Sequence, residues 1–112
     1  MKFENEIELR EFVRRFEECE MPLTEFSHAA HVVVGTVFVC DAAELALARM
    51  RDGLLRFTAH HGKTGVYKED VTREWIKRLR IHVEANPGKT VLELANGAVE
   101  EFARKRDSAA AT

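Results

Sequence analysis

Apolar residues recur at helical spacing along most of this chain, separated by charged ones. The segment 4–18 follows this pattern, and it predicts an amphipathic first helix whose apolar residues are Ile7, Phe12, Val13 and Phe16. Pro22 would end or interrupt that helix, because proline cannot continue the backbone hydrogen bonding. The first helix therefore has one face to bury against the rest of the protein.

The segment from Ala29 to Cys40 is almost wholly apolar. Thr24 or Ser27 can cap a helix ahead of it, running to about Cys40. The residues 32–39 include many β-branched side chains, so a strand is the alternative. A helix is favoured because no other segment shows the pattern of a partner strand. With apolar side chains all around it, this helix is expected at the centre of a bundle.

A third helix is predicted over about 42–61. Asp41 and Glu44 have the spacing of a capping box at its start, and Gly62 can end it. Gly53 lies inside this helix, where it indicates a bend or a close helix crossing. The inner face has steps of three and four residues and comprises Leu47, Met50, Leu54, Phe57 and His61.

Two further helices follow a loop over residues 63–69. The fourth is predicted from about Asp70 to Glu84, and its inward residues are Val71, Trp75, Ile76, Leu79 and Val83. Thr90 and Glu93 form the capping box of a fifth helix that reaches about residue 105. The pattern thus predicts an all-α fold, a single-domain bundle of about five helices over residues 1–106, with a frayed tail at 107–112.

Composition agrees with one folded domain of this kind. The 112 residues are 46% hydrophobic and 32% charged, a balance that excludes a disordered chain and predicts a single core. The N-terminus is acidic where a secretory peptide would be apolar, and the longest apolar stretch is shorter than the ~20 residues that span a membrane. The sequence therefore predicts a cytoplasmic protein that does not cross a bilayer, with Cys19 and Cys40 as free thiols.

The formal net charge of −2 argues against a general polyanion-binding protein. Basic side chains on the fourth helix would be the candidate nucleic-acid surface, namely Arg73, Lys77, Arg78 and Arg80. No helix-turn-helix signature accompanies them, so nucleic-acid binding is not expected.

The most distinctive polar residues are His28 and His31, which stand one helical turn apart where the apolar segment begins. Two imidazoles at this spacing can reach the same ligand. If His61 and Glu69 converge on them, the four side chains offer three nitrogens and a carboxylate, which suit a divalent transition metal such as Zn, Fe, Ni or Mn. The alternative is structural: the histidines can cap or pack, and Glu69 can favour the start of the fourth helix.

Three blocks of the sequence carry a resemblance to a family. They are Phe26-Ser27-His28-x-x-His31, then 55–62 ending in His60-His61-Gly62, then Tyr67-Lys68-Glu69-x-Val71-Thr72. Together they resemble a family of small, uncharacterised, all-helical bacterial proteins, over residues 26 to about 79.

The resemblance implies a site made of six residues and no particular activity. These residues are His28, His31, His61, Tyr67, Glu69 and Thr72. The chain departs from the family pattern at Lys68, where the pattern has histidine. A protonated lysine is a poor metal ligand, so this difference either argues against a full metal site or shifts the role toward binding an anion.

Two classes of function remain open from the sequence. The first is a metal- or small-molecule-binding helical protein, with or without acid/base chemistry, in which His28, His31, His61 and Glu69 hold a metal. Tyr67, Lys68 and Thr72 would contact the ligand. The second is an interaction module without catalytic activity, which forms a homo-oligomer or docks on a partner through an apolar helix face.

Overall fold

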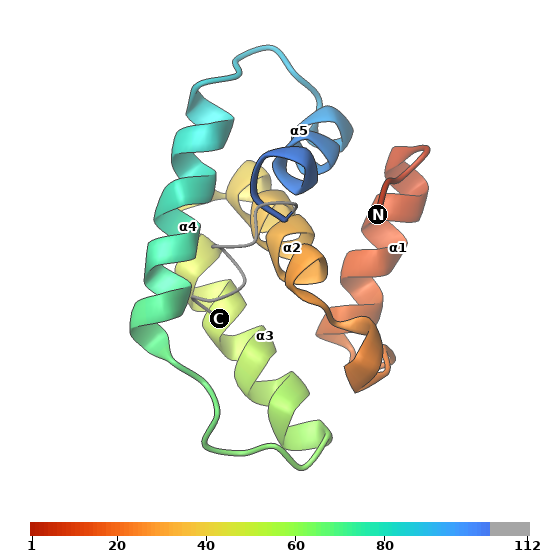
Figure 1. The fold of residues 1–112 in the computed structure, drawn as a ribbon, viewed down its shortest axis with the longest axis vertical. Coiled ribbons are helices and arrows are strands. Elements are labelled where there is room, and N and C mark those ends of the chain that lie inside the picture. Colours follow the sequence, from red (N-terminus) through yellow and green to blue (C-terminus); the bar gives the residue numbers. More distant parts are fainter. Residues whose placement is uncertain (104–112) are drawn as a thin grey trace.

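The structure is a computed structural model that describes residues 1–103, and within them it is all-helical (Figure 1). The predicted all-α bundle of about five helices is therefore confirmed, while the predicted tail at 107–112 lies outside the described residues. The α-helices are α1 (Glu6–Glu17), α2 (His28–Asp41), α3 (Ala46–His60), α4 (Glu69–Glu84) and α5 (Val91–Ala98). Short turns add η1 (Leu23–Glu25), η2 (Ala43–Leu45) and the π-helical η3 (Val99–Ala103).

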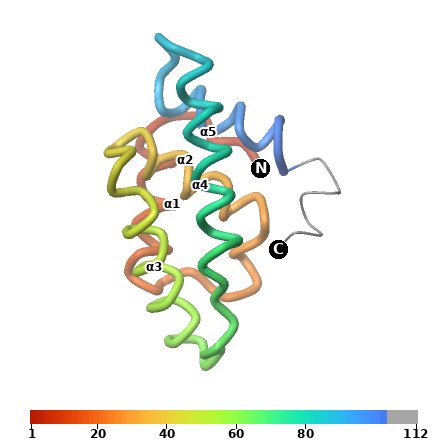
Figure 2. Tube along the Cα trace, turned by 90° about the vertical axis from the view of Figure 1, so that its left-hand side faces the viewer, coloured from red at the N-terminus to blue at the C-terminus, as the bar shows by residue number. Residues whose placement is uncertain are grey.

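Helix α2 forms the centre of the bundle, as its apolar sequence predicts. It packs against α3, α4 and α5, and Figures 1 and 2 show these helices gathered around it. Every residue from Val32 to Val39 is buried. The β-branched run is thus helical, because a helix surrounded by other helices can bury apolar side chains on all sides.

Two helix starts have the caps that the sequence indicates. The Ser27 hydroxyl accepts a hydrogen bond from the Ala30 N–H at 3.3 Å, which places the start of α2 at His28. Thr90 and Glu93 form a reciprocal capping box at the start of α5. These caps satisfy backbone donors that the first helical turn leaves without partners.

The expected capping box at Asp41 is wrong. Asp41 is the last residue of α2, and α3 begins only at Ala46, after the turn η2 and without a side-chain cap. The Asp41 carboxylate instead accepts hydrogen bonds from Arg10 at 2.9 Å and Arg49 at 3.1 Å. These two ion pairs connect the end of α2 to α1 and α3.

Helix α1 differs from its prediction in one inward residue and in how it ends. Ile7 is 83% exposed, and Leu9 takes its place in the core beside Phe12, Val13 and Phe16. The helix ends at Glu17, ahead of Pro22, and Cys19 adopts a left-handed backbone with φ of 59°. The turn is therefore made by the backbone before proline is reached.

Two glycines allow close helix contacts, and the position of Gly53 inside a predicted helix had indicated one of them. A Cβ atom at Gly53 would lie 2.8 Å from the Phe16 ring, which places the close crossing between α3 and α1. A Cβ atom at Gly35 would lie 2.7 Å from the Leu79 Cδ1 atom of α4. The absence of side chains at these positions lets α2 and α3 approach their neighbours.

The C-terminal end of the described chain also departs from the expected continuous helix. Helix α5 stops at Ala98 and passes into the π-helical turn η3, which ends at Ala103. The remaining predicted residues of the fifth helix lie outside the described part. Within residues 1–103, no helix combines the length and the apolarity needed to cross a membrane.

Candidate functional site

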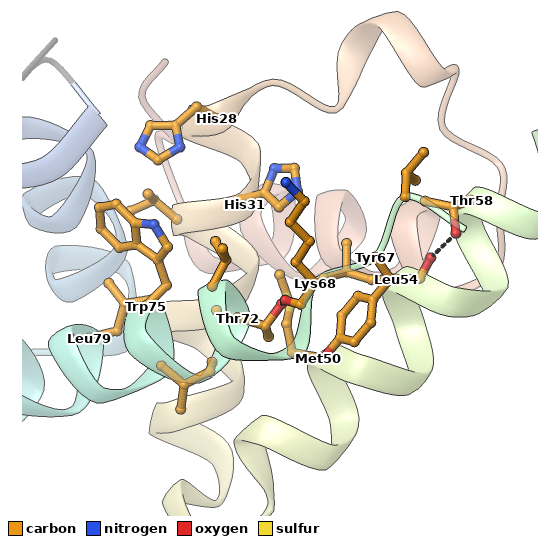
Figure 3. Close-up of a pocket in the computed structure, with 15 residues that line it drawn as sticks. His28, His31, Met50, Leu54, Thr58, Tyr67, Lys68, Thr72, Trp75 and Leu79 are labelled. Atoms are coloured by element: carbon orange, nitrogen blue, oxygen red, sulfur yellow. Dashed lines mark hydrogen bonds between the residues drawn. The ribbon is translucent and has the colours of Figure 1, made fainter. Parts of the chain in front are cut away.

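A cavity of about 190 Å³ lies between α2, α3 and α4 (Figure 3). The loop from α3 to α4 closes one side of it through Val66, Tyr67 and Lys68. Most of the wall is apolar. The lining residues are His28, His31, Val32, Gly35, Met50, Leu54, Thr58, Val66, Tyr67, Lys68, Val71, Thr72, Trp75, Ile76 and Leu79.

His28 is a polar residue of the cavity whose ring nitrogens are buried without a hydrogen-bond partner among residues 1–103. Each of these nitrogens exposes less than 1 Å² to solvent. The ring lies edge-on to the indole of Trp75, with 5.1 Å between centroids. Burial lowers the pKa of His28, which favours a neutral imidazole with one donor and one acceptor.

His31 lies one turn further along α2, and its orientation is fixed on both sides. Its Nδ1 is 3.0 Å from the Ser27 carbonyl oxygen, and its ring packs on Phe26 with 4.1 Å between centroids. Because a carbonyl can only accept, Nδ1 carries the proton, and Nε2 of the neutral ring presents a lone pair. Burial is the main cause that lowers the pKa of His31, and the nearby His28 lowers it further.

Three residues expected to contact a ligand, Tyr67, Lys68 and Thr72, line the cavity. The Tyr67 hydroxyl donates to the Glu69 carboxylate at 2.8 Å, and the Thr72 hydroxyl donates to the Lys68 carbonyl at 3.2 Å. The Lys68 side chain points toward His31 in Figure 3. The polar atoms of Tyr67 and Thr72 thus have protein partners, whereas the Lys68 ammonium forms no ion pair with any residue of 1–103.

Glu69 is held outside the cavity by arginines. Its carboxylate accepts two hydrogen bonds from Arg51, at 2.8 and 2.6 Å, and one from Arg73 at 3.0 Å. The Arg51 hydrogen bonds, followed by the one from Tyr67, lower the pKa of Glu69 to about 2. This carboxylate therefore joins α3 to the start of α4 as a charged structural group.

His61 also lies away from the cavity. It follows Phe57 on the core-facing side of α3, as expected, with 4.6 Å between the ring centroids. Its Nε2 is 3.1 Å from the carbonyl oxygen of Met21, in the connection between α1 and η1. His60 is exposed, and neither of these adjacent histidines lines the cavity.

The four expected metal ligands are thus divided between two environments. His28 and His31 line the cavity, whereas His61 and Glu69 are bonded to other parts of the protein. Among residues 1–103, no three His, Cys, Asp or Glu side chains gather closely enough to hold a metal ion. This arrangement differs from the expected set of three nitrogens and a carboxylate. The Met21 carbonyl already binds His61, and the Arg51 guanidinium already binds Glu69.

Some important residues were not identified from the sequence as parts of a site. Trp75 was expected to be core, yet it lines the cavity, and the role of Arg51 as the partner of Glu69 was missed. The spacing along the sequence could have identified Trp75. Successive steps of four, three and four residues connect Lys68, Thr72, Trp75 and Leu79, so the four side chains lie on one face of a helix.

Comparisons of this chain with protein-family models, with curated proteins and with solved structures find no match.

Proposed function

We propose that this protein binds a small, mainly apolar organic molecule in the cavity between α2, α3 and α4. The volume of about 190 Å³ sets the size of that molecule. Dry cavities of roughly 150 Å³ hold benzene, and a water molecule occupies about 30 Å³ of liquid, so about six to eight non-hydrogen atoms fit. Apolar walls with a few polar groups are typical of small-molecule sites.

The observation that carries the proposal is the pair of ring nitrogens on His28, neither of which has a hydrogen-bond partner within residues 1–103. A buried polar group without a partner costs about 1–3 kcal/mol, so folded proteins seldom keep one without a reason. His28 lines the cavity, and a ligand there could supply the missing hydrogen bond once the ring turns a nitrogen toward it. The ring therefore supports a site whose polar contact is completed by a ligand.

The donor set favours an organic ligand over a resident metal ion. Two imidazoles alone leave a transition metal short of the three or four protein ligands that its sites commonly have. Lys68, which lines the same cavity, would also place a positive charge near the metal. His28 and His31 are then hydrogen-bonding groups for the ligand, and acid/base chemistry on that ligand would use these same two rings.

The alternative of an interaction module gains less support. Large exposed apolar side chains are distributed over separate segments of the described chain: Met1, Ile7, Leu23, Leu45, Leu55, Val66 and Ile81. Single exposed apolar residues are normal on protein surfaces. Self-association or docking on a partner remains a second proposal that light scattering would test.

The experiment uses Trp75, the single tryptophan of the chain, as a reporter inside the cavity. Purified protein is titrated with a hexyl series of probes, namely 1-hexanol, hexanoate and hexylammonium, while tryptophan emission is recorded. We expect at least one probe to change the emission with saturation. The variant Val71→Phe, which places a larger ring in the cavity wall, should abolish that change.

The matched control is Ile81→Phe, which adds a ring at an exposed position of the same helix. It should bind the probes as the natural protein does. The proposal fails if no hexyl probe saturates the natural protein, or if Val71→Phe and Ile81→Phe bind equally well while both remain folded by circular dichroism.

A further inference from the structure

The charges around the cavity indicate which class of ligand it takes. Among residues 1–103, none of those that line it is an aspartate or a glutamate, and Lys68 is the one lining residue with a full positive charge at neutral pH. A ligand with a cationic head would therefore meet a like charge with no carboxylate to balance it. A ligand with one negative charge would meet its complement.

Lys68 is available for such a ligand because the neighbouring carboxylate is engaged elsewhere. Glu69 follows it directly in sequence, yet its oxygens bind Arg51, Arg73 and Tyr67. Lys68 forms no ion pair within the described part of the chain, and its side chain points toward His31. The chain thus separates two adjacent opposite charges and leaves the positive one beside the cavity.

A second donor lies on the facing helix. His28 is the first residue of α2, so it stands at the end of the helix where the backbone dipole favours negative charge. A neutral His28 ring offers one N–H to the ligand, and that N–H has no acceptor among residues 1–103. One ammonium and one neutral N–H can bind the two oxygens of a single carboxylate.

We propose that the cavity selects a monocarboxylate with a compact apolar body. The carboxylate lies beside Lys68, at the end of the cavity that His28 and His31 line, and the apolar body lies among Met50, Leu54 and Trp75. This inference rests on the proposed function, because it assigns the ligand class of the same cavity. One positive charge matches a monoanion better than a phosphate ester, which carries close to two negative charges near neutral pH.

The experiment compares the three hexyl probes on the natural protein and on Lys68→Met, with Trp75 emission as the readout. Hexanoate should bind about tenfold more tightly than 1-hexanol, as expected for one charge-assisted contact in a partly buried site. Hexylammonium should bind most weakly. In Lys68→Met, hexanoate should lose its advantage over 1-hexanol, while 1-hexanol should still bind with saturation, which shows that the cavity is intact.

Two further variants make the result specific to position 68. Lys63→Met removes a lysine of the same loop that does not line the cavity, and it should keep the preference for hexanoate. Lys68→Arg keeps the charge and should retain most of that preference.

The carboxylate assignment is overturned if 1-hexanol or hexylammonium binds the natural protein as tightly as hexanoate, or if Lys68→Met keeps the preference. In either case saturable binding of a hexyl probe would still support the cavity as a binding site. Failure of every probe to bind would instead remove the proposed function itself, together with the ligand class.

Discussion

The imidazole of His28 packs edge-on against the indole of Trp75, with 5.1 Å between ring centroids and 68° between ring planes. The contact joins the start of α2 to the middle of α4 beside the cavity. It orients a histidine whose ring nitrogens have no other partner in the described chain. It also places the single tryptophan of the chain beside His28, where we expect its emission to report on binding.

Replacing His28 by phenylalanine should stabilise the free protein while weakening binding. Phenylalanine keeps the aromatic contact with Trp75 and removes two buried polar atoms that lack partners. We expect His28→Phe to raise the free energy of unfolding by about 1 kcal/mol in urea denaturation. Hexanoate affinity should fall in the same variant, because the N–H donor is gone.

His82→Phe is the matched comparison, because the His82 Nε2 lies 3.2 Å from the Leu94 carbonyl oxygen. Its loss should lower the free energy of unfolding by about 1 kcal/mol. If His28→Phe destabilises the protein as much as His82→Phe does, then His28 already has a satisfied structural role and the argument from its ring nitrogens is wrong.

The stability of the protein should fall as pH is lowered from neutrality through about 6. Burial lowers the pKa of both His28 and His31 below the ordinary value of 6.5. In that range the unfolded chain binds more protons than the folded chain, so acid favours unfolding. Stability from the two neutral rings is therefore present above pH 6.5 and lost below it.

Nuclear magnetic resonance titration of the histidine ring protons gives the direct measurement. The rings of His28 and His31 should titrate below the ordinary value, and His28→Phe and His31→Phe should each remove one of these two signals. Ordinary titration of both rings near 6.5 would contradict the burial on which the neutral forms depend.

The ion pairs of Glu69 should matter in a separate and more acidic range. Its pKa of about 2 lies below the ordinary 4.5, mainly because of Arg51. The stability that the carboxylate contributes is present above pH 4.5 and is lost as pH falls toward 2. Glu69→Gln should therefore lower the thermal midpoint at pH 7, and the difference from the natural protein should shrink at low pH.

Glu74→Gln is the control for that measurement, since Glu74 is exposed and has a single long contact of 3.4 Å with Arg78. Its midpoint should hardly change, because exposed pairs contribute little. Equal effects of the two substitutions by circular dichroism would show that the Arg51 contact has no special weight.

The two close glycines should respond differently to alanine. At Gly53 the added Cβ meets the ring of Phe16, which is fully buried and rigid, at 2.8 Å. Overpacking lowers the free energy of unfolding by about 1–3 kcal/mol, whereas the better helix propensity of alanine raises it by about 1 kcal/mol. Gly53→Ala should therefore lower the free energy of unfolding by about 1 kcal/mol.

At Gly35 the contact is the end of the Leu79 side chain, which borders the cavity and can rotate into it. Gly35→Ala should leave the thermal midpoint nearly unchanged and weaken 1-hexanol binding, because Leu79 takes up part of the cavity. Equal destabilisation by both substitutions would show that Leu79 has no room to move.

Local signals in the sequence were sufficient for the helices and for part of the cavity. Ser27 and Thr90 cap helices where their side chains indicate, and Gly62 follows α3 with a positive φ of 72°. His28 and His31 share a helix face because they are three residues apart. These features depend on residues within one helical turn of each other, so they can be predicted from the sequence alone.

Features that depend on distant charges were not predictable in the same way. Asp41 has the spacing of a cap, yet Arg10 and Arg49 from other helices bind its carboxylate. Glu69 has the spacing of a site residue, yet Arg51 binds it. The sequence shows which charges exist, and only packing brings a particular guanidinium within hydrogen-bond distance.

By itself, the sequence determined an all-helical chain, a central apolar α2 and a polar position at His28 and His31. Tertiary structure decided which side chains share a cavity: it brought Lys68 and Trp75 to the two histidines and held His61 and Glu69 away. The physical reason is the separation along the chain over which each effect operates. Helical periodicity acts over three or four residues, whereas the choice of partner for a charge or a ring depends on how separate helices pack.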